Sequence, residues 1–78
     1  MIKINIPIVL IVYNRPHHTS KLLTCLKKFN FNKVFVISDG PKTNNKHDIF
    51  LVKKTRAIIK NHFKRKIITK LYSNINLG

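Results

Sequence analysis

The chain has 78 residues, of which 44% are hydrophobic, so it can form at most one small globular domain. Sixteen lysine and arginine residues against only Asp39 and Asp48 give a net charge of +14. A single cysteine excludes an intrachain disulfide, and no apolar run approaches the roughly 20 residues that a membrane-spanning helix needs. We therefore expect a cytoplasmic protein without a transmembrane segment, either free or peripheral to the membrane.

The excess of positive charge has two interpretations. A strongly basic surface attracts phosphates, nucleic acid or anionic lipid, which would suit a small basic module that binds nucleic acid or another anion. Lysine, isoleucine and asparagine are all abundant, however, as in proteins encoded by AT-rich genomes whatever their function. The basic residues are also scattered rather than gathered in an arginine-rich arm, and the composition leaves both interpretations open.

The first half of the sequence predicts a strand and then a helix. Residues 8–13 are apolar at both alternating positions and mostly β-branched, which is typical of a central strand in a parallel sheet. Pro16 suits the first turn of a helix, and leucines at helical spacing extend the helix over residues 17–29, with Cys25 expected as a small buried residue among them. We expect residues 30–32 to form a turn.

The second half repeats this pattern. Residues 33–38 form a second apolar run of strand length, and the loop after it is rich in turn-forming residues. Asp48 is a plausible cap for a helix that continues to about Phe63, with Arg56 interrupting its apolar stripe. A third strand is predicted over residues 67–72, followed by a polar loop.

The resulting order, β-α-β-α-β, predicts an α/β fold with a three-stranded parallel sheet. Crossovers between parallel strands are almost always right-handed, so a sheet in the order 3-2-1 places both helices on one face. The first two strands are nevertheless apolar on both faces, and one face would have no helix to cover it. We expect that face to be covered by a partner chain or by a missing C-terminal half, which would make the chain a fragment.

Polar residues follow the predicted strands at the edge where α/β proteins bind ligands. Asp39, directly after the second strand, could accept hydrogen bonds from a base or a ribose, or it could cap its own turn. Arg15 could hold a pyrophosphate through paired hydrogen bonds, or it could be a solvated loop residue. Asn14 could orient a ligand or shape the turn.

Other classes of site are disfavoured. Gly40 and Gly78 are the only glycines, so the sequence contains neither a dinucleotide-binding fingerprint nor a Walker loop. His17 and His18 are adjacent and would point about 100° apart on a helix, which does not make a metal pair.

Three segments together resemble a known family. Residues 7–16 (PIVLIVYNRP) are similar to the first strand and turn of family-2-like GT-A glycosyltransferases. Residues 36–41 (VISDGP) resemble the end of that family's second strand, and residues 74–78 (NINLG) resemble the entry into its next helix. The segments occur in the family's order and span nearly the whole chain. The resemblance implies that residues 1–78 are an incomplete domain, the first half of a GT-A nucleotide-diphosphosugar-binding fold.

The resemblance also implies a site and a ligand. Tyr13 and its neighbour Asn14 would contact the base, Asp39 would bond to the uracil or ribose, and Arg15 would approach the diphosphate of a UDP-sugar. Many members carry two acids after the second strand, whereas this chain has Ser38 before Asp39.

The same resemblance shows what the chain lacks. The family's Asp-x-Asp metal motif and its catalytic base are absent from this sequence, whose only acids are nine positions apart. A divalent metal such as Mg²⁺ or Mn²⁺ is therefore expected only for a full-length enzyme. The prediction is the nucleotide-sugar-binding portion of a glycosyltransferase, with no catalytic residue of its own and inactive alone.

Overall fold

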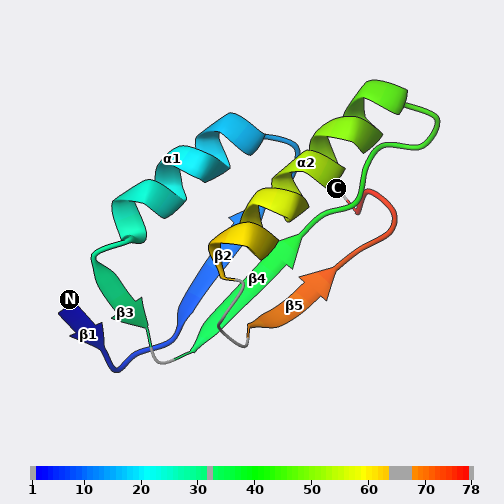
Figure 1. Cartoon of the computed structure of the whole chain (residues 1–78). Helices are drawn as coiled ribbons and strands as arrows, with labels where there is room; N and C mark the ends of the chain where they lie inside the picture. The colour runs from blue at the N-terminus through cyan, green and yellow to red at the C-terminus, as the bar shows by residue number, and fades with distance from the viewer. Residues whose placement is uncertain (1, 32, 64–67, 78) are drawn as a thin grey trace.

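The computed structural model describes residues 2–31, 33–63 and 68–77, which form an α/β fold (Figure 1). The helices and strands follow one another as β1 (Ile2–Ile4), β2 (Ile8–Val12), α1 (Pro16–Leu26), β3 (Phe29–Phe31), β4 (Val34–Ser38), α2 (Lys46–His62) and β5 (Thr69–Tyr72). No helix within the described residues is long and apolar enough to cross a membrane.

The main sheet has three parallel strands in the order β2-β4-β5, which confirms the predicted 3-2-1 arrangement. Its register places Leu10 beside Val36 and Ile37 beside Leu71. Both helices lie on the same face of this sheet (Figure 1), as right-handed crossovers that advance in one direction require. The carboxyl ends of all three strands consequently meet at one edge.

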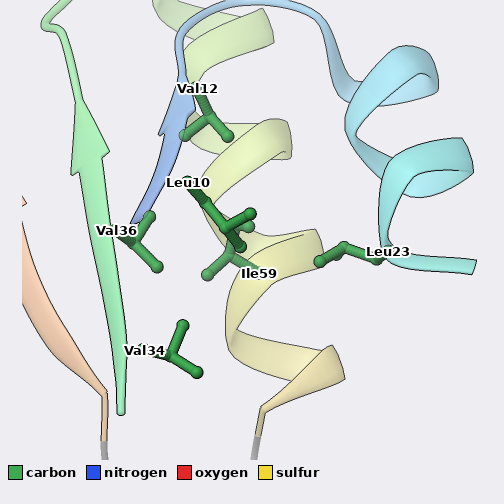
Figure 2. Close-up of a cluster of buried hydrophobic side chains, with 6 residues drawn as sticks. All are labelled: Leu10, Val12, Leu23, Val34, Val36 and Ile59. Carbon is green, nitrogen blue, oxygen red and sulfur yellow. The ribbon is translucent and has the colours of Figure 1, made fainter. Parts of the chain in front are cut away.

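The core lies between the main sheet and the two helices. Alternate residues of β2 and β4 point toward the helices and meet side chains from α1 and α2 (Figure 2). The buried cluster consists of Leu10, Val12, Leu23, Val34, Val36 and Ile59. The intervening strand residues face the other side, which no helix of the described residues covers; Phe35 is partly buried there, and four residues are exposed: Val9, Ile11, Ile37 and Leu71. We call these four residues the bare face.

The prediction for residues 27–31 was wrong. Helix α1 ends at Leu26 rather than at Phe29, and residues 29–31 form strand β3, which pairs in parallel with β1 in a second, two-stranded sheet. The sequence Phe-Asn-Phe alternates apolar and polar residues, which is a strand pattern. The asparagine in this segment favours a turn when the sequence is considered alone. The parallel pairing with β1, which is distant in sequence, makes the segment extended. Residue 32 lies outside the described residues.

Three smaller expectations also change. Asn45, not Asp48, is the N-cap of α2, because its side-chain Oδ1 accepts the Asp48 N–H at 2.9 Å. Strand β5 begins at Thr69, and Ile67, the predicted first residue of that strand, lies outside the described residues. Cys25 is exposed rather than buried, because it follows the buried Leu23 by two positions and therefore points about 200° away from it.

Candidate functional site

A cavity of about 690 Å³ opens at the carboxyl ends of β2, β4 and β5. The four residues that the sequence predicts as a nucleotide site all line this cavity. Three of them follow β2, and the fourth follows β4: Tyr13, Asn14, Arg15 and Asp39. Its apolar part comes from three residues of the bare face, Ile11, Ile37 and Leu71, with Leu22 of α1 and Leu77 at the rim. An apolar surface bordered by a few polar groups is the usual composition of a small-molecule site.

Asp48, for which the sequence predicts only a helix-capping role, holds Tyr13 and Asn14 in place. The Tyr13 hydroxyl donates to Asp48 Oδ2 at 2.6 Å, and Asn14 Nδ2 donates to Asp48 Oδ1 at 2.6 Å. The backbone N–H of Lys42 also donates to Oδ2, at 2.7 Å. Only 5% of the Asp48 surface is exposed, so the three donors satisfy a largely buried carboxylate. Its position in the first turn of α2 also suits the positive end of the helix dipole.

The topology explains why Asp48 reaches these side chains. Helix α2 follows β4 and must begin at the carboxyl edge of the sheet, where β2 also ends. An acidic residue in the first turn of α2 therefore lies close to whatever follows β2. The sequence alone could have predicted that Asp48 lies near the β2 end, because it is one of only two acids and falls at a predicted helix start.

The hydrogen bond between Tyr13 and Asp48 shifts the pKa of both side chains. The hydrogen bond to Asp48, with desolvation and the nearby negative charges, raises the pKa of Tyr13 to about 12. The same bond, together with the Lys42 N–H, lowers the pKa of Asp48 below its ordinary value. At neutral pH Tyr13 is a protonated donor and Asp48 a carboxylate, and the hydrogen bond between them fixes the position of the β2 end.

Asp39 uses one carboxylate oxygen for two backbone hydrogen bonds. Its Oδ1 accepts the N–H of Gly40 at 2.8 Å and the N–H of Leu77 at 2.9 Å. Among the described residues, no hydrogen bond reaches Oδ2. Asp39 therefore organises the turn through Oδ1, and the residue also lines the cavity.

Gly40 allows the segment after β5 to lie against the β4 end. Its N–H donates to the Ile75 carbonyl at 3.2 Å, and a Cβ at this position would lie 2.5 Å from the backbone nitrogen of Ile75. Asn76 Nδ2 also donates to the Gly40 carbonyl, at 3.2 Å. This close approach brings Leu77 to the rim of the cavity.

Arg56, which interrupts the apolar stripe of α2, joins two strand ends. Its Nε donates to Ser38 Oγ at 2.9 Å, and its Nη2 donates to the carbonyls of Asp39 at 3.1 Å and Ser73 at 2.7 Å. The guanidinium also stacks on Tyr72, with its Cζ 4.6 Å from the ring centroid. A planar group with several donors suits converging carbonyl oxygens, and it fixes the spacing of β4 and β5 at the site.

Arg15 stands apart from these networks. It is exposed, precedes α1 as its N-cap residue, and makes no side-chain cap there. The N-terminus of α1 next to the cavity is thus without a side-chain cap, and helix N-termini favour negative charge. An anion at this edge would meet both the Arg15 guanidinium and the helix end.

Within residues 2–31, 33–63 and 68–77, no group of three or more His, Cys, Asp or Glu side chains lies close enough together to hold a metal ion. No protein-family model matches the chain, and neither curated proteins nor solved structures contain a significant match to it.

Proposed function

We propose that this chain is the nucleotide-sugar-binding portion of a GT-A-type glycosyltransferase and that the strand-end cavity receives the nucleotide of a UDP-sugar. The observation that carries the proposal is the meeting of an acceptor, Asp39, and a cation, Arg15, at the carboxyl edge of a parallel sheet beside an apolar surface. These are the chemical elements that a nucleoside diphosphate requires: hydrogen-bond acceptors for the base or ribose, an apolar contact, and a positive group for phosphate.

The nucleoside would lie between the ends of β2 and β4. Asp39 lines the cavity, and its Oδ2 would accept a base N–H or a ribose hydroxyl. The Tyr13 hydroxyl already donates to Asp48, so this residue would contribute the face of its ring. Asn14 also donates to Asp48, which leaves its side-chain oxygen as the acceptor for a ligand.

The diphosphate would lie toward α1. Arg15 is a cation at the cavity wall, and the α1 N-terminus beside it adds the partial positive charge of a helix end. The N-terminus of α2 is a poorer candidate, because the Asp48 carboxylate already occupies it.

In this proposal the chain binds the donor and does not transfer the sugar. The sequence contains no Asp-x-Asp motif, and the raised pKa of Tyr13 keeps its hydroxyl protonated. The resemblance assigns a divalent metal and a catalytic base to further residues of a full-length enzyme. Additional protein, either a C-terminal half or a partner chain, would then cover the bare face.

Calorimetric titration of the 78-residue chain with UDP and with uridine tests the proposal. We expect UDP to bind more tightly than uridine, and Arg15→Gln to weaken UDP roughly tenfold while leaving uridine unchanged. Lys33→Gln is the matched control, since it removes an exposed positive charge at the opposite end of β4. An equal loss for both variants would reduce the effect to net charge, and no binding of UDP by the wild type would refute the proposal.

A further inference from the structure

The exposed side of α2 carries a row of lysines that has no part in the cavity. Lys46, Lys53 and Lys60 are exposed and spaced seven residues apart, so they lie along one side of the helix over about 21 Å. Lys54 borders the same row, and Phe50 lies within it, with 58% of its surface exposed. We call these five residues the lysine row.

Neither acid of the chain neutralises the lysine row. Asp48 is buried and lies about 200° around the helix from Lys46, where it accepts its three hydrogen bonds. Asp39 lies at the strand ends, bonded to Gly40 and Leu77. The row is therefore a positive surface whose length fits an extended polyanion rather than a single phosphate.

The aromatic ring within the row favours one class of polyanion. Lys54 Nζ lies 5.8 Å from the centroid of the Phe50 ring, so a cation and an exposed aromatic face occur together. Surfaces that bind single-stranded nucleic acid combine cations for the phosphates with aromatic rings on which unpaired bases stack. A membrane surface fits less well, because α2 buries its apolar side, including Val52 and Ile59, against the sheet and has no apolar face left to insert.

We propose that the lysine row of α2 binds single-stranded nucleic acid, with lysines on successive phosphates and Phe50 stacked on a base. Since the row consists of lysines and one phenylalanine, binding depends on charge and stacking and shows little sequence preference. The row and the strand-end cavity share no residue, so this activity is independent of nucleotide-sugar binding.

Fluorescence anisotropy with a labelled oligothymidylate tests this proposal at several salt concentrations. The triple variant Lys46→Gln/Lys53→Gln/Lys60→Gln should weaken binding at least tenfold and reduce the slope of log K against log salt by about 2, since each single-strand phosphate contact contributes about 0.7. Glutamine keeps a helix propensity close to that of lysine, and far-UV circular dichroism checks that α2 is intact. Phe50→Ala should weaken binding roughly five- to 150-fold with the salt slope unchanged.

The matched control is Lys21→Gln/Lys28→Gln/Lys33→Gln, which removes three exposed lysines outside α2. It should leave the affinity within about threefold of wild type at moderate salt, where distant charges are screened. An equal loss in the control variant would show that the charge acts diffusely and would overturn the proposal. So would the absence of saturable binding, or binding of the lysine row to anionic phospholipid vesicles but not to the oligonucleotide.

Discussion

Asp39 and Asp48 lie at the same edge of the sheet, but their surroundings give them different tasks. Asp48 is buried beneath Tyr13, Asn14 and the Lys42 N–H, and all three donate to it. Asp39 accepts the backbone N–H groups of Gly40 and Leu77 with one oxygen, and it lines the cavity. We therefore expect substitutions at Asp48 to act on stability and substitutions at Asp39 to act on binding.

The Asp39→Asn variant separates the two oxygens of Asp39. Asparagine keeps one oxygen that can accept from Gly40 and Leu77, while the group in place of Oδ2 becomes a donor. We expect UDP to bind roughly ten- to hundredfold more weakly, with little change in melting temperature. Titration calorimetry and a thermal melt measure the two effects. Unchanged affinity with a lowered melting temperature would leave Asp39 as a turn residue only.

The Asp48→Asn variant should change how stability depends on pH. Because the folded-state pKa of Asp48 is lowered, its contribution is present above the unfolded value near 3.9 and is lost as the pH falls through the folded value. Asp39 and Asp48 are the only acidic side chains, so few other groups titrate in this range. Urea denaturation between about pH 5 and pH 3 should show the wild type losing stability and approaching the variant. Parallel curves would show that Asp48 does not contribute in this way.

At the scale of elements, the sequence predicted what local periodicity determines. The apolar runs at residues 8–13 and 33–38 predict buried parallel strands and, through handedness, both helices on one face. The strands observed there are Ile8–Val12 and Val34–Ser38. Local periodicity does not predict strand β3, because its partner β1 is distant in sequence. Helical periodicity likewise does not reveal the role of Arg56, which donates to the carbonyl groups of Ser38, Asp39 and Ser73. The positions of Arg15 and Asp39 after strands can be predicted from local pattern, whereas the contacts of Asp48 depend on tertiary structure.

A matched pair of valine substitutions tests the two faces of the sheet. Ile59 is 0% exposed in the core between sheet and helices, whereas Ile11 is 78% exposed on the bare face. Ile59→Val should lower the free energy of unfolding by about 0.5–1.5 kcal/mol, and Ile11→Val should change it by less than about 0.5 kcal/mol. Urea denaturation of both variants measures this difference. Equal costs would mean that the bare face is covered in solution, and a dependence on protein concentration would identify a second copy as the cover.

At the scale of the whole molecule, the buried core, the strand-end edge, the outer side of α2 and the bare face have different properties. The core between the main sheet and the helices holds the fold together, and the strand-end edge gathers Tyr13, Arg15 and Asp39 around a cavity. The outer side of α2 carries the lysine row. The bare face borders the cavity and supplies part of its apolar surface, so whatever covers that face would also shape the site.

Amide chemical-shift mapping during a UDP titration tests the central claim most directly, since it shows where the nucleotide binds as well as whether it binds. We expect saturable shifts at the amides of Arg15, Asp39 and Leu77, around the strand-end cavity, with the amides of Lys53 and Lys60 in α2 unchanged. Shifts confined to α2, or no saturable shift at the strand ends, would contradict the assignment of the cavity as a nucleotide site.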